Sequence, residues 1–365
     1  MTKRPQPKPG ILNIAPYVPG KSGTRPGQQA IKLSSNESPL GASPLASAAY
    51  AEAVSRLAEY PEGSSAKLRE TLAEAHGLEA ERIVIGAGSD EILHLLAETY
   101  LGDGDEAVQS EYGFLMYPIA TMGAGAAPVV ARDRNYTVDV DAMLAAVTDR
   151  TRIVWLANPN NPTGTWLDDA EVRRLHAGLR PDIVFVIDNA YAEYVTAPGF
   201  TTGAELVREA DNVVMVRTFS KMGLAALRVG WLYGPDHIVD AINRIRGPFN
   251  VSVPAQEAAA AATRDSEFTA SLAAHNARWR DYLTAELRSN HVTVPDSQGN
   301  FILAIFDEAA GPSAADVFAA LADAGLITRE MGGYGLANAV RISIGSEDAM
   351  RRTVAVIKRL QGEGN

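Results

Sequence analysis

The chain has no cysteine among its 365 residues. Disulfide bonds, thiol catalysis and zinc sites built on thiolates are therefore excluded. The sequence also lacks any run of about 18 apolar residues, and its basic, proline-rich first ten residues have no apolar core of the kind a secretion signal needs. From these absences we expect a cytoplasmic protein that does not enter a membrane.

Basic residues are too few for a protein that attracts nucleic acid through its overall charge. The chain has 44 acidic against 33 basic residues, and its formal charge of −11 disfavours non-specific binding to nucleic acid or anionic membranes. An anionic small molecule would have to be bound by local arginines. The length and the hydrophobic content of 46% are those of a globular protein large enough for two domains.

Apolar runs typical of buried strands alternate with helical patterns over residues 46–250. The runs lie at 107–108, 128–131, 153–157, 183–187, 213–216 and 229–233. Such alternation predicts an α/β fold with a mainly parallel sheet in α/β/α layers. We assign this large domain, which would bind the ligand, to residues 46–250.

The rest of the sequence predicts a smaller α+β domain at residues 251–365, which the N-terminal segment 1–45 would join. The expected elements are a long helix from Pro254 to about Leu287, strands at 292–294, 301–305 and 340–344, a helix at 315–321, and a last helix capped by Ser346.

A lysine accompanied by hydroxyls and an arginine is the main chemical signal. Lys221 ends the sequence Thr-Phe-Ser-Lys, and Arg228 follows seven residues later. An amine becomes nucleophilic when burial or a nearby positive charge lowers its pKa, and we expect Arg228 to supply that charge. The hydroxyls of Thr218 and Ser220, with the guanidinium, suit a phosphate ester, so the group suggests pyridoxal phosphate. Taken alone, a serine followed by a lysine is also typical of an ordinary surface.

Polar residues follow two of the predicted strands, at the sheet edge where α/β proteins bind ligands. Asp188 follows the run 183–187 and could keep the cofactor's ring nitrogen protonated, while Tyr191 could donate to the ring oxygen. Asn161 lies between two prolines on a rigid turn, where it could meet a ring substituent. Alternatively, Asp188 caps a helix and Asn161 belongs to a plain turn.

A third signal is the small-residue start of a helix at Gly88, Ser89 and Asp90, after a short strand at 83–85. Backbone N–H groups exposed there can bind an anion such as a phosphate. Many turns from strand to helix carry the same residues for conformational reasons, so this signal is weak by itself.

Taken in order, these motifs resemble the aspartate-aminotransferase-like, fold-type I enzymes that use pyridoxal phosphate, and the resemblance covers essentially the whole chain. It implies that Lys221 holds the cofactor as an aldimine, that Asp188 binds the pyridine nitrogen, and that Tyr112 stacks on the ring. It also implies that Asn161 and Tyr191 bind the ring oxygen. The phosphate would contact Gly88, Ser89, the Asp90 backbone, Thr218, Ser220 and Arg228, together with Tyr60 from the neighbouring subunit of a homodimer.

The outer segments 14–20, 33–41 and 328–343 resemble histidinol-phosphate aminotransferases more specifically. The resemblance implies that Tyr17 and Arg341 bind the substrate's phosphate with Arg329 nearby. Asn36 and Asn161 would also contact the substrate. The implied reaction converts L-histidinol phosphate and 2-oxoglutarate into imidazole-acetol phosphate and L-glutamate, with no metal.

Two alternatives share these motifs: an aminotransferase for aromatic amino acids or prephenate, and a threonine-phosphate decarboxylase. A regulatory, non-catalytic domain would require a basic helix-turn-helix region before Tyr17, which the sequence does not show. One departure from the family is that the interval from Lys221 to Arg228 is a residue shorter than in many relatives. We expect Arg228 to reach the phosphate nevertheless.

Overall fold

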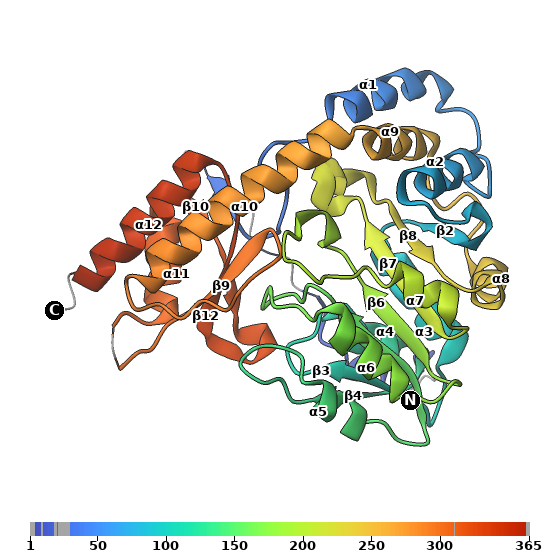
Figure 1. Cartoon of the computed structure of the whole chain (residues 1–365), viewed down its shortest axis with the longest axis horizontal. Helices are drawn as coiled ribbons and strands as arrows, with labels where there is room; N and C mark the ends of the chain where they lie inside the picture. The colour runs from blue at the N-terminus through green and yellow to red at the C-terminus, as the bar shows by residue number, and fades with distance from the viewer. Residues whose placement is uncertain (1–3, 9, 18–19, 21–29, 310, 363–365) are drawn as a thin grey trace.

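The computed structural model describes residues 4–8, 10–17, 20, 30–309 and 311–362. It shows a larger part with a central sheet and a smaller part with a shorter sheet (Figure 1). The long helix α10 (Ser266–Arg288) runs from one part to the other.

The central sheet has the strand order β2-β8-β7-β6-β5-β3-β4. Strand β8 pairs antiparallel with β2 and β7, and the remaining pairs are parallel, which confirms the predicted mainly parallel α/β sheet. The six predicted runs correspond to β3 through β8. The strands are β2 (Ile83–Gly86), β3 (Glu106–Ser110), β4 (Ala127–Ala131), β5 (Thr151–Ala157), β6 (Val184–Asp188), β7 (Val213–Thr218) and β8 (Gly230–Tyr233).

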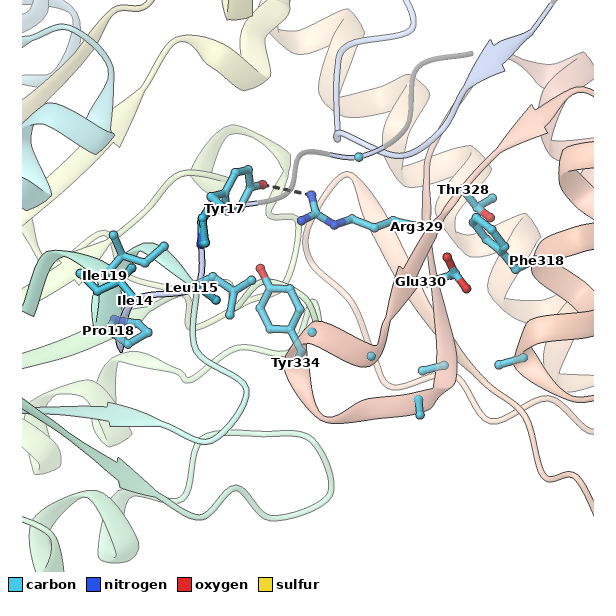
Figure 2. Close-up of a pocket in the computed structure, with 18 of the residues that line it drawn as sticks. Ile14, Tyr17, Leu115, Pro118, Ile119, Phe318, Thr328, Arg329, Glu330 and Tyr334 are labelled. Atoms are coloured by element: carbon cyan, nitrogen blue, oxygen red, sulfur yellow. Dashed lines mark hydrogen bonds between the residues drawn. The ribbon is translucent and has the colours of Figure 1, made fainter. Parts of the chain in front are cut away.

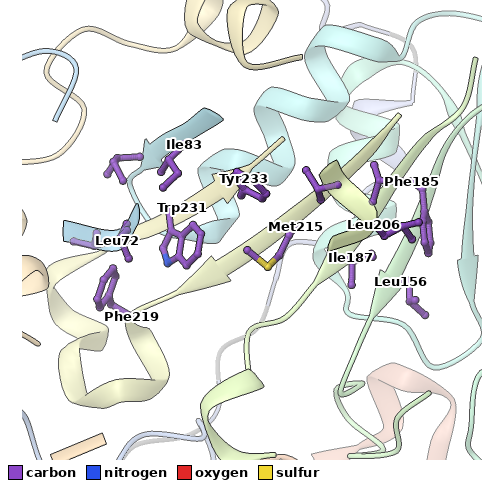
Figure 3. Packing of buried hydrophobic residues seen from close by; sticks show 14 of the residues in the cluster. Leu72, Ile83, Leu156, Phe185, Ile187, Leu206, Met215, Phe219, Trp231 and Tyr233 are labelled. Atoms are coloured by element: carbon purple, nitrogen blue, oxygen red, sulfur yellow. The ribbon is translucent and has the colours of Figure 1, made fainter. Parts of the chain in front are cut away.

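Both faces of this sheet are buried under helices. In β6, Phe185 and Ile187 belong to the apolar cluster on one face (Figure 3), whereas Val184 and Val186 belong to the cluster on the other. A strand covered on both faces needs no polar side chain, which explains the unbroken apolar run. The first face packs against α1 (Pro44–Ala53), α2 (Ala66–His76), α5 (Val140–Ala145), α6 (Asp169–Ala177), α7 (Ala204–Glu209) and α9 (Val253–Arg264), and the second against α3 (Ser89–Tyr100), α4 (Met116–Ala124) and α8 (Asp236–Ile245).

The smaller part contains an antiparallel sheet in the order β11-β12-β9. One face packs against α10, α11 and α12, and a short parallel pair, β1 with β10, places part of the N-terminal segment beside this sheet. The last helix begins as predicted, with the Ser346 hydroxyl accepting from the Ala349 N–H at 3.3 Å. The elements are β1 (Ile31–Lys32), β9 (Phe301–Ile305), β10 (Leu326–Ile327), β11 (Arg329–Met331), β12 (Leu336–Ser343), α11 (Ala314–Asp323) and α12 (Glu347–Gly362).

Two details differ from the sequence prediction. The long helix is broken at Asp265, whose carboxylate accepts from the Phe268 N–H at 3.1 Å and starts α10. The strand predicted at 292–294 is wrong, because only Thr293 forms an isolated bridge, with Ile305. Helix α9 packs against α1 and the core of the large sheet, although the predicted boundary at residue 250 assigns it to the small domain. The division at residues 45 and 250 stays a prediction.

Among the residues that the structure describes, no helix combines the length and the apolar character that a membrane crossing requires. The same residues contain no group of three or more His, Asp or Glu side chains placed to hold a metal ion.

Candidate functional site

A cavity of about 440 Å³ lies at the carboxyl ends of strands β5, β6 and β7 and at the start of α3. These strand ends meet because neighbouring parallel strands finish at the same edge of a sheet. The small part and the N-terminal segment contribute the outer wall. Among the lining residues are Tyr17, Asn36, Ser89, Asp90, Asn161, Asp188, Tyr191, Thr218, Ser220, Lys221, Arg228, Arg329 and Arg341.

Lys221 is held in the cavity wall by the tight turn that follows β7. Its Nζ donates to the carbonyl of Ser35 at 3.4 Å and lies 5.7 Å from the centroid of the Tyr191 ring. Burial lowers the pKa of Lys221 to about 8, and the charge of Arg341 contributes next. Arg228 has a smaller effect on this pKa, so the expectation that it supplies the main local charge is wrong. A neutral amine near pH 8 is a competent nucleophile.

Asp188 is the last residue of β6, and its side chain is buried. Its carboxylate accepts from the Tyr117 hydroxyl at 2.8 Å and from the Ala190 N–H at 3.2 Å. Burial raises the pKa of Asp188 to about 6, against the opposing effect of these two donors. The Tyr117 ring stacks on Trp155 with centroids 5.3 Å apart, which fixes its hydroxyl. A carboxylate held in this way suits a cationic ring nitrogen.

Phosphate-binding groups converge where α3 begins. Arg228 donates to the Ser220 hydroxyl at 3.1 Å and to the Asp90 carboxylate at 2.8 Å, so it reaches the cavity despite the short interval from Lys221. Glycine is required at two neighbouring positions. Gly88 has a φ of +82°, which residues with a Cβ rarely adopt, and a Cβ at Gly230 would lie 2.3 Å from the Ser89 nitrogen. Backbone N–H groups, hydroxyls and a guanidinium this close together fit a phosphate monoester.

Asn161 faces the cavity, whereas Asn158 is tied to the backbone of Leu167. The Asn161 Oδ1 accepts from Arg341 Nη1 at 2.6 Å, and Arg341 Nη2 donates to the carbonyl of Ser34 at 2.7 Å. Arg341 is only 2% exposed, and burial lowers its pKa. Within the described part of the chain its Nε has no hydrogen-bond partner. A buried guanidinium in this state favours an anionic ligand.

Tyr17 and Arg329 lie at the border between this cavity and a second one of about 690 Å³. Arg329 Nη1 donates to the Tyr17 hydroxyl at 3.0 Å, and its guanidinium lies 5.3 Å from the centroid of the Tyr17 ring (Figure 2). The second cavity has a largely apolar wall that includes Leu115, Ile119 and Phe318. A substrate's anionic end can therefore meet the arginine while apolar groups lie beside it.

Some predicted residues lie outside the cavity or make other contacts. The Tyr112 ring stacks on Tyr136 with centroids 5.9 Å apart, and Phe114, which sequence reasoning missed, lines the cavity instead. Tyr60 is 82% exposed and stacks on Phe249. Their roles toward a cofactor stay predictions. Phe114 shares the motif of Tyr112, whereas nothing in the sequence singled out Tyr117.

Comparisons with known proteins agree with this geometry. The pattern that defines the family "Aminotransferase class I and II" matches residues 28–357. The histidinol-phosphate aminotransferase of Rhodopseudomonas palustris strain BisA53 is 52% identical over 99% of each chain, and that of strain BisB18 is 54% identical over 97% of this chain and 98% of its own. The crystal structure of histidinol-phosphate aminotransferase from Sinorhizobium meliloti in complex with pyridoxal-5'-phosphate has the same fold. Its TM-score is 0.87 at 24% identity, covering 97% of each chain. The chain therefore belongs to the class I and II aminotransferases and, within them, to the histidinol-phosphate aminotransferases.

Proposed function

We propose that this chain transfers the amino group of L-histidinol phosphate to 2-oxoglutarate, giving imidazole-acetol phosphate and L-glutamate. The observation that carries the proposal is one cavity that contains the Lys221 amine, the buried Asp188 carboxylate and the buried Arg341 guanidinium. Identities of 52% and 54% to enzymes of this name over nearly the whole chain support it.

Each polar group around the cavity has a definite task in this reaction. Pyridoxal phosphate, when bound, supplies an electron sink for the substrate carbon that bears the amino group. Lys221 would hold the cofactor and would move the proton at that carbon, for which a pKa of about 8 is suitable. Asp188 would keep the ring nitrogen protonated. Tyr191 and Asn161 would offer hydrogen-bond donors to the ring oxygen, while Ser89, Thr218, Ser220 and Arg228 would hold the phosphate.

The substrate pocket must accept a phosphate monoester in one half-reaction and a carboxylate in the other. A guanidinium can bind either group through two parallel hydrogen bonds, and the Nε of Arg341 has no hydrogen-bond partner among the residues that the structure describes. Arg329 and Tyr17 lie beside it at the border of the cavity. We propose that these three residues bind the anionic end of both substrates.

Steady-state kinetics with two amino donors test the function. With 2-oxoglutarate as acceptor, kcat/KM for L-histidinol phosphate is expected to exceed that for L-phenylalanine by about 100-fold or more, because a phosphate with two negative charges and three oxygens can bind Arg341 and Arg329 together, whereas phenylalanine offers them a single carboxylate. Equal or higher values with phenylalanine would favour the aromatic aminotransferase. Release of carbon dioxide from threonine phosphate without 2-oxoglutarate would favour the decarboxylase.

We also propose a homodimer whose active sites are shared. Apolar side chains are exposed along the segment from α1 to Tyr60 and at Phe249, where a monomer would leave them in water. Tyr60 is 82% exposed and does not line the cavity of its own chain. In the proposed dimer it contacts the phosphate bound by the neighbouring subunit. The other exposed apolar residues of the segment are Leu45, Tyr50, Val54 and Leu57.

Mixed dimers test the shared site. Lys221→Ala and Tyr60→Ala chains are each expected to have low activity, but unfolding and refolding them together in equal amounts should restore it in about a quarter of the sites. A mixed dimer then contains one site with an intact Lys221 and an intact Tyr60 from the other chain. The readout is transamination rate per site after mixing. If Tyr60 served its own subunit, no site would be complete and the mixture would stay as inactive as its components.

A further inference from the structure

The hydroxyl of Tyr191 lies at the end of a buried chain of hydrogen bonds. Asn36 Nδ2 donates to it at 3.0 Å, the Ser343 hydroxyl donates to Asn36 Oδ1 at 2.8 Å, and the Asn36 backbone N–H donates to the Ser343 oxygen at 2.9 Å. The three side chains are 1–4% exposed. Asn300 holds the segment by donating to the Asn36 carbonyl at 2.9 Å. These hydrogen bonds connect the N-terminal segment, strand β12 and the large part.

Two hydrogen bonds set the direction of this network. The Ser343 oxygen accepts from the Asn36 backbone N–H, which can only donate, and the Ser343 hydroxyl donates its single hydrogen to Asn36 Oδ1. The amide of Asn36 is thereby oriented with Nδ2 toward Tyr191, and an amide nitrogen cannot accept. The Tyr191 oxygen must accept this bond, which leaves its own hydrogen available to the cavity.

A second residue of β12 orients Asn161 in the same way. Arg341 and Ser343 are two positions apart, so their side chains lie on the same face of the strand. Arg341 donates to Asn161 Oδ1, which leaves the Asn161 Nδ2 as a donor. One strand of the smaller sheet thus fixes the hydrogen-bond direction of two residues in the large part.

We propose that Asn36 and Ser343 are positioning residues that direct the hydroxyl hydrogen of Tyr191 toward the ring oxygen of bound pyridoxal phosphate. This inference rests on the proposed function. It gives Asn36 a role different from the substrate contact that the sequence resemblance implies. A donor at the ring oxygen stabilises negative charge there, and it therefore lowers the pKa at which the bound cofactor changes its visible absorbance.

The test is a pH titration of the visible absorbance of the cofactor-loaded protein. Asn36→Gly is expected to raise the titration pKa by about one unit, because the orientation of Tyr191 is lost. Glycine tolerates the φ of +56° at this position. Tyr191→Phe should give a similar rise, and the double variant no more than Tyr191→Phe alone. Thr353→Val, which removes a buried hydroxyl in α12, serves as the control and should titrate as the wild type does.

Ser343→Ala provides a second variant if Asn36→Gly does not fold. It should also raise the pKa at which the visible absorbance of the bound cofactor changes. A wild-type titration in both variants, or shifts that add in the double variant, would overturn the positioning role. A wild-type protein without any visible absorbance after incubation with pyridoxal phosphate would instead overturn the proposed function, and the positioning role with it.

Discussion

Replacing Lys221 with alanine is expected to lower kcat for transamination by about 10⁴-fold or more, because in the proposed function one side chain performs two tasks. The amine would attach the cofactor and would later move the proton at the substrate carbon. Its pKa of about 8 reflects burial first and the charge of Arg341 second, and both depend on its place in the cavity wall. Measurements of kcat and of the visible absorbance after addition of pyridoxal phosphate check both tasks, since the covalent link and its absorbance should disappear together.

Borohydride reduction separates the covalent role from simple binding. The wild-type protein should gain the mass of the reduced cofactor on Lys221, and Lys221→Ala should gain none. Lys358→Ala is the matched control, because Lys358 pairs with Glu286 on the surface and does not line the cavity. Its kinetics and its mass increase should equal those of the wild type. Full turnover in Lys221→Ala would refute the assignment.

The sequence predicts well those strands that are buried on both faces of the sheet. The run 183–187 lies between two layers of helices, so its apolar character is continuous and its strand assignment is unambiguous. Residues 292–294 are all β-branched, and two of the three are valine, yet only Thr293 finds a partner. A short segment forms a strand only if tertiary packing brings the edge of another strand next to it. The β-propensity of its residues does not contain that information.

The same distinction applies to the cavity. Asn161, Asp188 and Lys221 follow predicted strands, so the sheet topology alone places them at one edge. After burial, the largest influence on the pKa of Lys221 is the positive charge of Arg341, which lies in a strand of the smaller part. The closeness of these two residues depends on how the two parts pack. Tyr117 is likewise a helix residue whose role follows from its stacking on Trp155.

Asp188→Asn is expected to lower kcat by about 10²-fold to 10³-fold while preserving the fold. A neutral amide cannot keep the ring nitrogen protonated, so the cofactor would lose its capacity to accept electrons. Asparagine has nearly the same shape, its oxygen can accept from the Ala190 N–H, and its amide can donate to the Tyr117 oxygen. The hydrogen bonds that hold this side chain are therefore retained in number.

The stability of the cofactor-free protein distinguishes this electronic role from a structural one. The folded-state pKa of Asp188, about 6, exceeds the ordinary value of 3.8, so its protonated form favours folding below pH 3.8 and that contribution is lost as the pH rises through about 6. At pH 7 the buried charge costs on the order of 3 kcal/mol, which asparagine avoids. The unfolding temperature of cofactor-free Asp188→Asn at pH 7 should therefore be at least that of the wild type, as measured by calorimetry.

The exposed Asp182, paired with Arg180, provides the matched substitution Asp182→Asn, which should change neither kcat nor the unfolding temperature appreciably. A wild-type kcat in Asp188→Asn would show that the ring nitrogen does not need this carboxylate. A low kcat together with a lowered unfolding temperature would show that Asp188 has a structural role in the cavity. Because the expected result pairs a large loss of rate with undiminished stability, the two measurements made on one preparation decide between these roles.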